Sequence, residues 1–364
     1  MFEEFASIMN LGAFSDEEKA LIKSNPQYKI KANKIFKKAR QNPDIKKCYF
    51  CGENVGSYCN SHSIPAFCLR NIATSGDVMS INLLIDNPLL KKESGINNAG
   101  TFKLICRDCD SKIFSDYENP DNYLSQPTQK MLAQIALKNN LKSISKRLFE
   151  IELYKIIESE NINATDLCQS KNYVNNLDLR EYIIGFNKAK KALENNTIEN
   201  YYVCYYERLN YVVPIAFQSQ LALAFDFNGD IINNLYNQSP EYKLKNINIC
   251  VFPLKNESII ILFIENGDKR YRSFYKQFKN LGLDDRLLAL TFIMFAYSED
   301  IFFSKAIEKN ATSCKKLCEL GKSGASIISP FPTVSPMKKI KEIYDLNNRK
   351  NIPNLLSKQY EIKN

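Results

Sequence analysis

The sequence predicts an α+β protein with a cysteine-rich N-terminal region, a helical middle and a C-terminal antiparallel sheet with helices. Three patterns predict this order. Two Cys-x-x-Cys pairs span residues 48–51 and 106–109, apolar residues recur at helical spacing from about 129 to 193, and aromatic and β-branched runs recur within 201–264. The 364 residues are enough for two or three domains. Composition divides the chain into five segments: 1–44 (basic, helical), 45–122 (cysteine-rich), 123–198 (helical connector), 199–325 (α+β domain of unknown role) and 326–364 (loop and basic C-terminal segment).

Composition and charge limit the class of protein. An apolar fraction of 45% and a charged fraction of 24% are typical of a soluble globular protein. The excess of 49 Lys and Arg over 40 Asp and Glu gives a net charge of +9, which fits a polyanionic partner without requiring one. The N-terminus carries Glu3 and Glu4 where a signal peptide is basic, and no apolar run reaches the roughly 18 residues that span a bilayer. We therefore expect a cytoplasmic protein without a membrane partner.

The first segment predicts a basic helical region before the cysteines. Ser15 can cap a helix, and Glu18 stands at the reciprocal capping-box position. Beyond Pro26, residues such as Lys34 and Lys38 share one helical face. That face is either a solvated surface or a surface that contacts DNA phosphates. The candidate nucleic-acid-binding residues are Lys34, Lys37, Lys38, Arg40, Lys46 and Lys47.

The two cysteine pairs predict a structural zinc site. A two-residue spacing points both sulfurs of a pair at one spot, and two pairs complete a tetrahedral four-thiolate site with no open position. The predicted ligands are Cys48, Cys51, Cys106 and Cys109. Cys59 and Cys68 are ambiguous, because either residue suits a replacement ligand or a buried position. The remaining cysteines are expected to be small buried hydrophobes, although the last two, one helical turn apart, also suit a ligand pair: Cys168, Cys204, Cys250, Cys314 and Cys318.

The segment between these pairs resembles a known family. A first knuckle, the run Ser61-His62-Ser63-Ile64-Pro65 and a second knuckle that opens a helix are similar to the zinc-containing branch of the HNH endonucleases over about residues 45–120. The resemblance implies a ββα-metal (treble-clef) finger with His62 as the general base. The preceding residue, commonly a metal ligand in that family, is Ser61 here. The family's central Asn falls near Thr101, and its final His or Asn is Asp110.

Because of these departures, a catalytic Mg²⁺ or Mn²⁺ ion would need oxygen ligands from other residues than in the family. We expect Asp110, as a catalytic residue and metal ligand, together with Glu118. If residues 110–118 form one helix, the two carboxylates lie on nearly the same face, about 12 Å apart along the axis. Alternatively, Asp116 and Glu118 are solvated or pair with Lys or Arg.

The chemistry that the resemblance implies is hydrolysis of a phosphodiester. Neutral imidazole would take a proton from the attacking water, while a magnesium ion stabilises charge on the departing oxygen. A backbone carbonyl commonly holds the other ring nitrogen and so fixes the tautomer. Pro65 cannot donate to a sheet and helps to end the strand that presents His62. The alternative roles of His62 are a zinc ligand or a satisfied core histidine.

The later elements follow from periodicity. Apolar spacing predicts one or two helices from Gln129 to Ser159 and another from Leu179 to Leu193, with Asp178 as a cap. The expected strands are 201–206, 212–217, 221–227, 247–253 and 258–264, with Asn228-Gly229 as a hairpin signal. Helices are expected at 273–281 and 284–297. Residues 62–105 predict an extended insert that ends in a strand from Thr101, and the C-terminal segment is expected to be peripheral or partly disordered.

The sequence therefore favours a metal-dependent HNH-type endonuclease that cuts DNA rather than RNA. Its cofactors would be structural Zn²⁺ and catalytic Mg²⁺ or Mn²⁺, and a small molecule or protein is expected to act as a trigger at the C-terminal domain. Enzymes with this arrangement often serve bacterial antiphage defence, which is an analogy from the family. The alternative is a non-catalytic, zinc-stabilised nucleic-acid-binding or sensor protein. The sequence contains no Walker loop, dinucleotide-binding glycine motif or serine nucleophile elbow.

Overall fold

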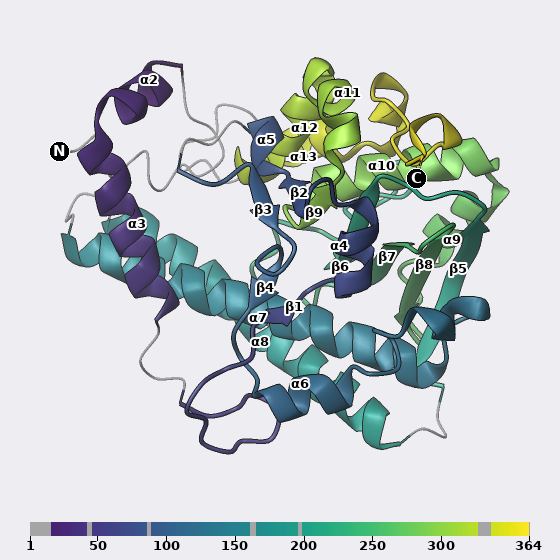
Figure 1. Ribbon diagram of the computed structural model, residues 1–364, viewed down its shortest axis with the longest axis horizontal. Coiled ribbons are helices and arrows are strands. Elements are labelled where there is room, and N and C mark those ends of the chain that lie inside the picture. Colours follow the sequence, from purple (N-terminus) through teal and green to yellow (C-terminus); the bar gives the residue numbers. More distant parts are fainter. Residues whose placement is uncertain are drawn as a thin grey trace.

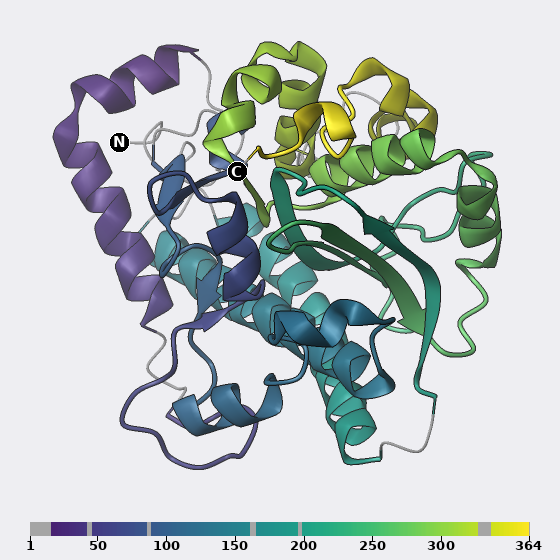
Figure 2. The same ribbon diagram turned by 45° about the vertical axis from the view of Figure 1, so that its right-hand side comes forward.

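The protein is an α+β structure, as predicted, in which helices cover both faces of an antiparallel sheet (Figure 1; Figure 2). The computed structural model describes residues 16–41, 46–85, 89–160, 165–195, 199–326 and 336–363. The sheet has seven strands in the order β3-β2-β9-β6-β7-β8-β5. Their bounds are β2 Asp77–Ser80, β3 Glu93–Gly95, β5 Tyr201–Leu209, β6 Ile215–Leu221, β7 Ile247–Pro253, β8 Ser258–Glu265 and β9 Ile301–Phe303.

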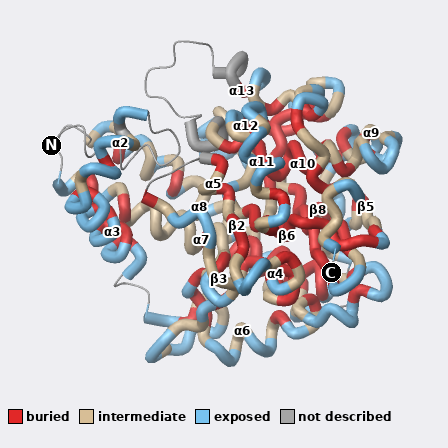
Figure 3. The backbone as a smooth tube through the Cα atoms, turned by 45° about the horizontal axis from the view of Figure 1, so that its top comes forward, coloured by how far each residue is buried: buried red, intermediate tan, exposed pale blue. Residues whose placement is uncertain are grey.

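Side-chain alternation gives the sheet two buried faces. In β7, Ile249 and Val251 point into one core, which they share with helix α10 (Leu283–Tyr297), whereas Cys250 and Phe252 point into another core below helix α7 (Gln129–Glu160). The central strands are therefore buried along their whole length, as the red segments in Figure 3 show. This double burial explains the nearly continuous apolar runs of the sequence.

The sheet crosses the predicted boundary between the cysteine-rich segment and the α+β domain. Strands β2 and β3 come from the chain between the two cysteine pairs, and β2 joins β9 through the pair Met79↔Phe303. The predicted extended insert also contains helices α4 (Ala66–Ile72) and α5 (Asn82–Ile85). Segments 45–122 and 199–325 thus share one sheet, because short edge strands gain hydrogen bonds by joining an existing one.

Two long helices form the middle of the chain. The first predicted helix is the single helix α7, and its partner α8 is longer than predicted and spans Thr165–Glu194. Asp178 lies inside α8 and pairs with Arg147 of α7, so its prediction as a cap was wrong. The helices approach closely where an added Cβ on Gly185 would lie 2.5 Å from Asn140 Oδ1.

Helix α2 (Asp16–Ser24) and helix α3 (Pro26–Arg40) pack against the far ends of this pair through a third core that contains Phe36 and Ile156. The expected cap Ser15 lies outside the described residues. The expected helices at 273–281 and 284–297 are present as α9 (Arg272–Asn280) and α10. The remaining helical elements are α11 Glu308–Ser313, α12 Lys315–Ser326, α13 Pro336–Tyr344 and the 3-10 turns η1 Pro120–Leu124, η3 Lys305–Ile307, η4 Leu346–Asn351 and η5 Lys358–Tyr360.

Two expectations for the second half were wrong. The run 221–227 is not a strand beyond Leu221, although Gly229 does form a tight turn at φ +84° that is closed by a bond to the Asp226 carbonyl. The C-terminal segment is not merely peripheral, because Leu346, Leu355 and Leu356 are fully buried in the core around α10. Apolar side chains spaced through a basic segment were the signal for this packing.

The close approach at Gly185 predicts that Gly185→Ala destabilises the protein. Asn140 is buried and bonds to the Ala136 carbonyl and Gln220, so it cannot retreat from the new methyl group. We expect a net loss in free energy of unfolding of about 1–2 kcal/mol, since overpacking outweighs the roughly 1 kcal/mol gained by Ala in a helix. Urea denaturation measures this loss. Gly56→Ala, with nothing within 4 Å of its Cβ, is the control, and an unchanged midpoint for Gly185→Ala would contradict the analysis.

Candidate metal centre and histidine site

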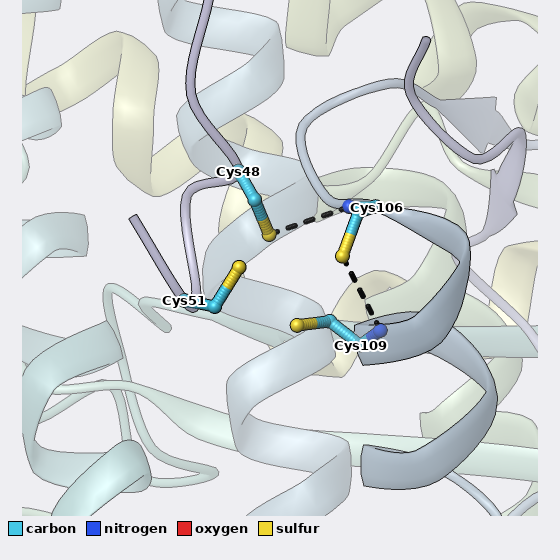
Figure 4. A group of neighbouring side chains, drawn as sticks. All are labelled: Cys48, Cys51, Cys106 and Cys109. Carbon is cyan, nitrogen blue, oxygen red and sulfur yellow. Dashed lines mark hydrogen bonds between the residues drawn. The ribbon is translucent and has the colours of Figure 1, made fainter. Parts of the chain in front are cut away.

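Four cysteine sulfurs meet between the 48–52 turn and the start of helix α6 (Arg107–Ile113), as Figure 4 shows. The sulfurs of Cys48, Cys51, Cys106 and Cys109 all lie within 4.8 Å of one another. A tetrahedral zinc ion with bonds of about 2.3 Å holds its sulfurs about 3.8 Å apart, so small inward movements suffice to close the site. Within the described residues this is the only group of three or more Cys, His, Asp or Glu side chains that could hold a metal ion.

Local backbone geometry builds this cluster. Gly52, at φ +77°, donates its N–H to the Cys48 carbonyl at 2.8 Å and so closes the first knuckle. Cys106 caps α6, and its sulfur accepts the Cys109 N–H at 3.4 Å. Burial by itself raises the pKa of the Cys48 thiol, but backbone N–H groups of Cys51, Cys106 and Phe50 outweigh this effect and lower the pKa to about 7. A substantial thiolate fraction of Cys48, the form that binds metal, is therefore present near neutral pH. Burial and the neighbouring cysteine sulfurs raise the pKa of Cys51 and Cys109, so metal binding there is coupled to the release of their protons.

The ambiguous cysteines are not part of the cluster. Cys59 Sγ donates to Asp110 Oδ2 at 3.4 Å, and burial and the Asp110 charge raise its pKa to about 11. Cys68 is fully buried in the apolar core. The other five cysteines are packing residues, with three buried and two, Cys314 and Cys318, half-buried against the core around α10.

His62 lies on a strand–strand–helix unit. Strand β1 (Ser61–His62) pairs antiparallel with β4 (Thr101–Phe102), so that His62 faces Thr101, and α6 follows along the chain. His62 Nε2 lies 2.9 Å from the Ile96 carbonyl oxygen. A carbonyl can only accept, so in the neutral imidazole Nε2 carries the proton and Nδ1 has the lone pair. The ring is half-buried and is not among the metal-site donors, which leaves the alternative of a zinc-ligand role without support.

Asp110 and Glu118 do converge on one cation, but that cation is the ammonium group of Lys138. The Lys138 side chain comes from α7 and is fully buried. Its Nζ lies 3.0 Å from Asp110 Oδ1, 3.1 Å from Glu118 Oε1 and 2.9 Å from Ser61 Oγ. Ser61 also donates to Asp110 Oδ1 at 2.5 Å. We call Ser61, Asp110, Glu118 and Lys138 the Lys138 cluster.

This arrangement does not fit the expected Mg²⁺ or Mn²⁺ site. A divalent ion bound to both carboxylates would lie where Lys138 Nζ lies, and two cations cannot share that space without strong repulsion. Burial alone would raise the pKa of Asp110, but the charge of Lys138 and the bonds from Ser61 and Lys138 hold it below its usual value. Asp110 is therefore ionised at neutral pH, with its charge balanced by the protein itself.

The helical-face argument for the two carboxylates was wrong. Helix α6 ends at Ile113, and Glu118 follows a turn in which its N–H bonds the Phe114 carbonyl at 3.1 Å. The turn, not helical periodicity, brings Glu118 to Lys138. The alternative of a pairing with a basic residue is confirmed for Asp116, which pairs with Lys130, and for Glu118.

Sequence reasoning missed Lys138 and the buried polar side chains near it. Gln134, fully buried on α7, accepts the Tyr117 N–H at 2.9 Å and donates to Asp116 Oδ2 at 2.6 Å. One signal was available. Lys138 stands three residues from both Ile135 and Leu141, on the apolar face of the predicted helix, where a lysine requires a buried partner.

The six candidate nucleic-acid-binding residues are all exposed. Helix α3 buries Ala32, Ile35 and Phe36 against α7 and α8 and keeps its lysines on the opposite face. Lys46 and Lys47 lie directly before the first knuckle. Exposure is a property that a phosphate-binding surface and a solvated surface share.

Comparisons with known proteins identify no relative: no protein-family model matches the chain, and neither a curated protein nor a solved structure matches it. The described helices include none that is long and apolar enough to cross a membrane. The fold and site thus define an α+β protein with a four-cysteine cluster that could bind a metal such as zinc.

The cluster predicts a metal content of one equivalent per chain. Cys51→Ser or Cys109→Ser should lose the metal and lower the thermal midpoint, because binding energy is coupled to folding. Elemental analysis of purified protein measures the content. Cys314→Ser, outside the cluster, is the matched control, and full metal retention in Cys109→Ser would contradict the assignment.

The Lys138 cluster predicts a large effect of Lys138→Met. Removal of the ammonium group leaves two carboxylates unpaired, and we expect a loss in free energy of unfolding of about 3–5 kcal/mol at pH 7. Asp110 has a lowered pKa in the folded state, so its contribution is present above the unfolded pKa of about 3.9 and is lost as pH falls through the folded value. The difference in free energy of unfolding between the wild-type protein and Lys138→Met should therefore become smaller as the pH falls.

Chemical denaturation of both proteins from pH 3 to 8 measures this difference in free energy of unfolding. Adding Asp110→Asn to Lys138→Met removes one unpaired charge and should recover part of the stability. Lys112→Met, exposed on α6, is the control. Equal stability of Lys138→Met and the wild-type protein at pH 7 would show that the ion pairs contribute nothing net.

Proposed function

We propose that this protein is an HNH-type endonuclease in which His62 is the general base for phosphodiester hydrolysis. The observation that carries the proposal is the fixed orientation of His62. Its Nε2 is held by the Ile96 carbonyl, and Nδ1 is left as a proton acceptor. The half-buried ring belongs to a β1–β4–α6 unit whose order agrees with the ββα layout that the resemblance implies.

The chemistry follows from that acceptor. Nδ1 takes a proton from water as the water oxygen attacks phosphorus, and the phosphorus–oxygen bond on the far side breaks. The Ile96 carbonyl stabilises the imidazolium that forms, because it accepts from the charged ring more strongly than from the neutral one. A fixed ring needs no reorientation during the step.

Zinc fits the four-cysteine cluster as a structural ion. Four thiolates leave no coordination position for substrate, so the ion would hold the 48–52 turn against α6 and take no part in hydrolysis. The family also implies a catalytic divalent ion. The Lys138 cluster does not fit it, and we assign no step to such an ion.

The exposed basic face supports nucleic acid as the substrate. Residues Lys34, Lys37, Lys38 and Arg40 on α3, with Lys46 and Lys47, offer phosphate contacts without sequence readout. Duplex DNA is the proposed target and the cytoplasm the proposed location. A role in antiphage defence rests on the family resemblance alone.

One observation favours a second candidate, a zinc-stabilised nucleic-acid-binding protein without catalysis. Lys138 neutralises the two carboxylates that were expected to hold the catalytic ion. A protein that had lost hydrolysis could keep its fold and its phosphate contacts through the same residues.

The test compares cleavage of supercoiled plasmid by the wild-type protein, His62→Ala and His62→Gln, with Mg²⁺, with Mn²⁺ and with EDTA. The Gln amide can still donate to the Ile96 carbonyl but cannot act as a base. We therefore expect both variants to lose activity by about 10²–10⁴-fold, the usual contribution of general-base catalysis.

Metal content and thermal midpoint, measured on the same samples, show whether each variant retains its fold. Cleavage by His62→Gln at the wild-type rate would refute the base assignment. Intact plasmid with all three proteins, together with salt-dependent DNA binding, would favour the second candidate. If cleavage persists in EDTA while the cysteine-bound metal is retained, hydrolysis does not require a divalent ion that EDTA can remove.

A further inference from the structure

A second candidate site lies about two turns along α7 from the Lys138 cluster, towards the C-terminus of the helix. A cavity of about 430 Å³ opens between α7, α8, strand β6 and the end of α10. Its volume falls in the range of small-molecule sites, roughly 300–1,000 Å³. We call it the interhelical cavity. It contains none of the residues assigned to the metal centre or to His62.

Most charged groups of this cavity are already paired. Lys146 Nζ lies 2.8 Å from Glu299 Oε2, and Arg147 Nε lies 3.0 Å from Asp178 Oδ2. Arg147 also pairs with Glu150. Asp300 pairs with Lys142, so all four acidic side chains of the wall have basic partners from α7, and this pairing weakens the repulsion that an anionic ligand meets.

Two hydrogen-bond donors on α8 have no hydrogen-bond or ion-pair partner among the described residues. The Asn175 side chain is only 7% exposed, and its Nδ2 has no acceptor. Lys171 forms no ion pair with any residue in the described part of the chain, and burial lowers its pKa. Both residues line the cavity, and their spacing of four places them on one helical face. A buried donor without an acceptor destabilises the protein, so a ligand that supplies an acceptor to Asn175 Nδ2 recovers this loss.

Aromatic rings form other parts of the wall. Tyr154 and Tyr182 come from the two long helices, and Tyr297 and Tyr344 come from the opposite side. The last two rings lie 4.3 Å apart between centroids. Tyrosine faces pack well against planar rings, whereas the two unpaired donors suit phosphate or carboxylate oxygens.

We propose that the interhelical cavity binds a small anionic molecule that carries a planar ring, of the nucleoside monophosphate class. The anion contacts Lys171 and Asn175, and the ring packs against the tyrosines. Lys138 and Lys146 are eight residues apart on α7, about 12 Å along its axis. Helix α7 therefore contributes residues both to this site and to the Lys138 cluster.

The test is isothermal titration of the full-length protein with AMP, GMP, CMP and UMP. Titrations with adenosine, which has the ring but no anion, and with inorganic phosphate, which is the anion without a ring, measure the binding of each part alone. We expect at least one monophosphate to bind at least tenfold more tightly than either part, and Lys171→Met or Asn175→Leu to weaken it at least tenfold. Lys191→Met, exposed on the same helix, should bind normally.

Thermal midpoints separate binding from folding. Asn175→Leu removes an unsatisfied amide, so its midpoint without ligand should equal or exceed that of the wild-type protein. A lower midpoint would indicate that Asn175 has a structural partner and would overturn its assignment. Absence of binding by any monophosphate at millimolar concentration, or equal binding by the α8 variants, would overturn the site. Neither result bears on His62, because titration requires no cleavage.

Discussion

The buried ammonium group of Lys138 is the interaction on which the arrangement of this protein depends. Its removal from water costs several kcal/mol, and only the simultaneous approach of Asp110, Glu118 and Ser61 offsets that cost. These partners come from α6, the turn after it and β1, whereas Lys138 comes from α7. The cluster therefore fixes the strand that carries His62 against the long helix that covers the sheet. Any shift of α7 along its axis would separate these charges, so the position of the helix and the geometry of the histidine site are coupled.

The four-cysteine cluster fixes the other end of the same unit. It brings the 48–52 turn next to the first turn of α6. The Lys138 cluster holds α6 and the turn after it against α7. Between them β1 is short, and two residue pairs of β-sheet would not be stable alone. The orientation of His62 thus depends on these two polar anchors together with the apolar core that contains Ile64 and Phe102.

Local patterns in the sequence predicted those features that depend on near neighbours. The spacing of Cys48 and Cys51 and of Cys106 and Cys109 fixes loop geometry within each pair, and their joining into one cluster followed from zinc chemistry. The helix from Gln129 and the strands around Ile249 and Ile261 were predictable because burial imposes a periodicity on the chain. The errors have a common cause. Asp178 can cap a helix, but tertiary pairing with Arg147 placed it inside one. Asp110 and Glu118 can ligate a metal, but a lysine distant in sequence took that position.

The sequence by itself therefore determined the α+β class and the four cysteines that cluster, since each depends on residue type and short spacing, whereas the role of His62 as a base rests on the family resemblance and stays a prediction. Only the tertiary structure decided that β2 and β3 join the sheet of the second half, that Lys138 occupies the centre of the predicted metal site, and that Lys171 and Asn175 line one cavity. Edge-strand pairing, buried charge compensation and cavity formation all involve partners tens of residues or more apart. Their free energies depend on the distance and burial of both groups, which periodicity along one segment does not encode.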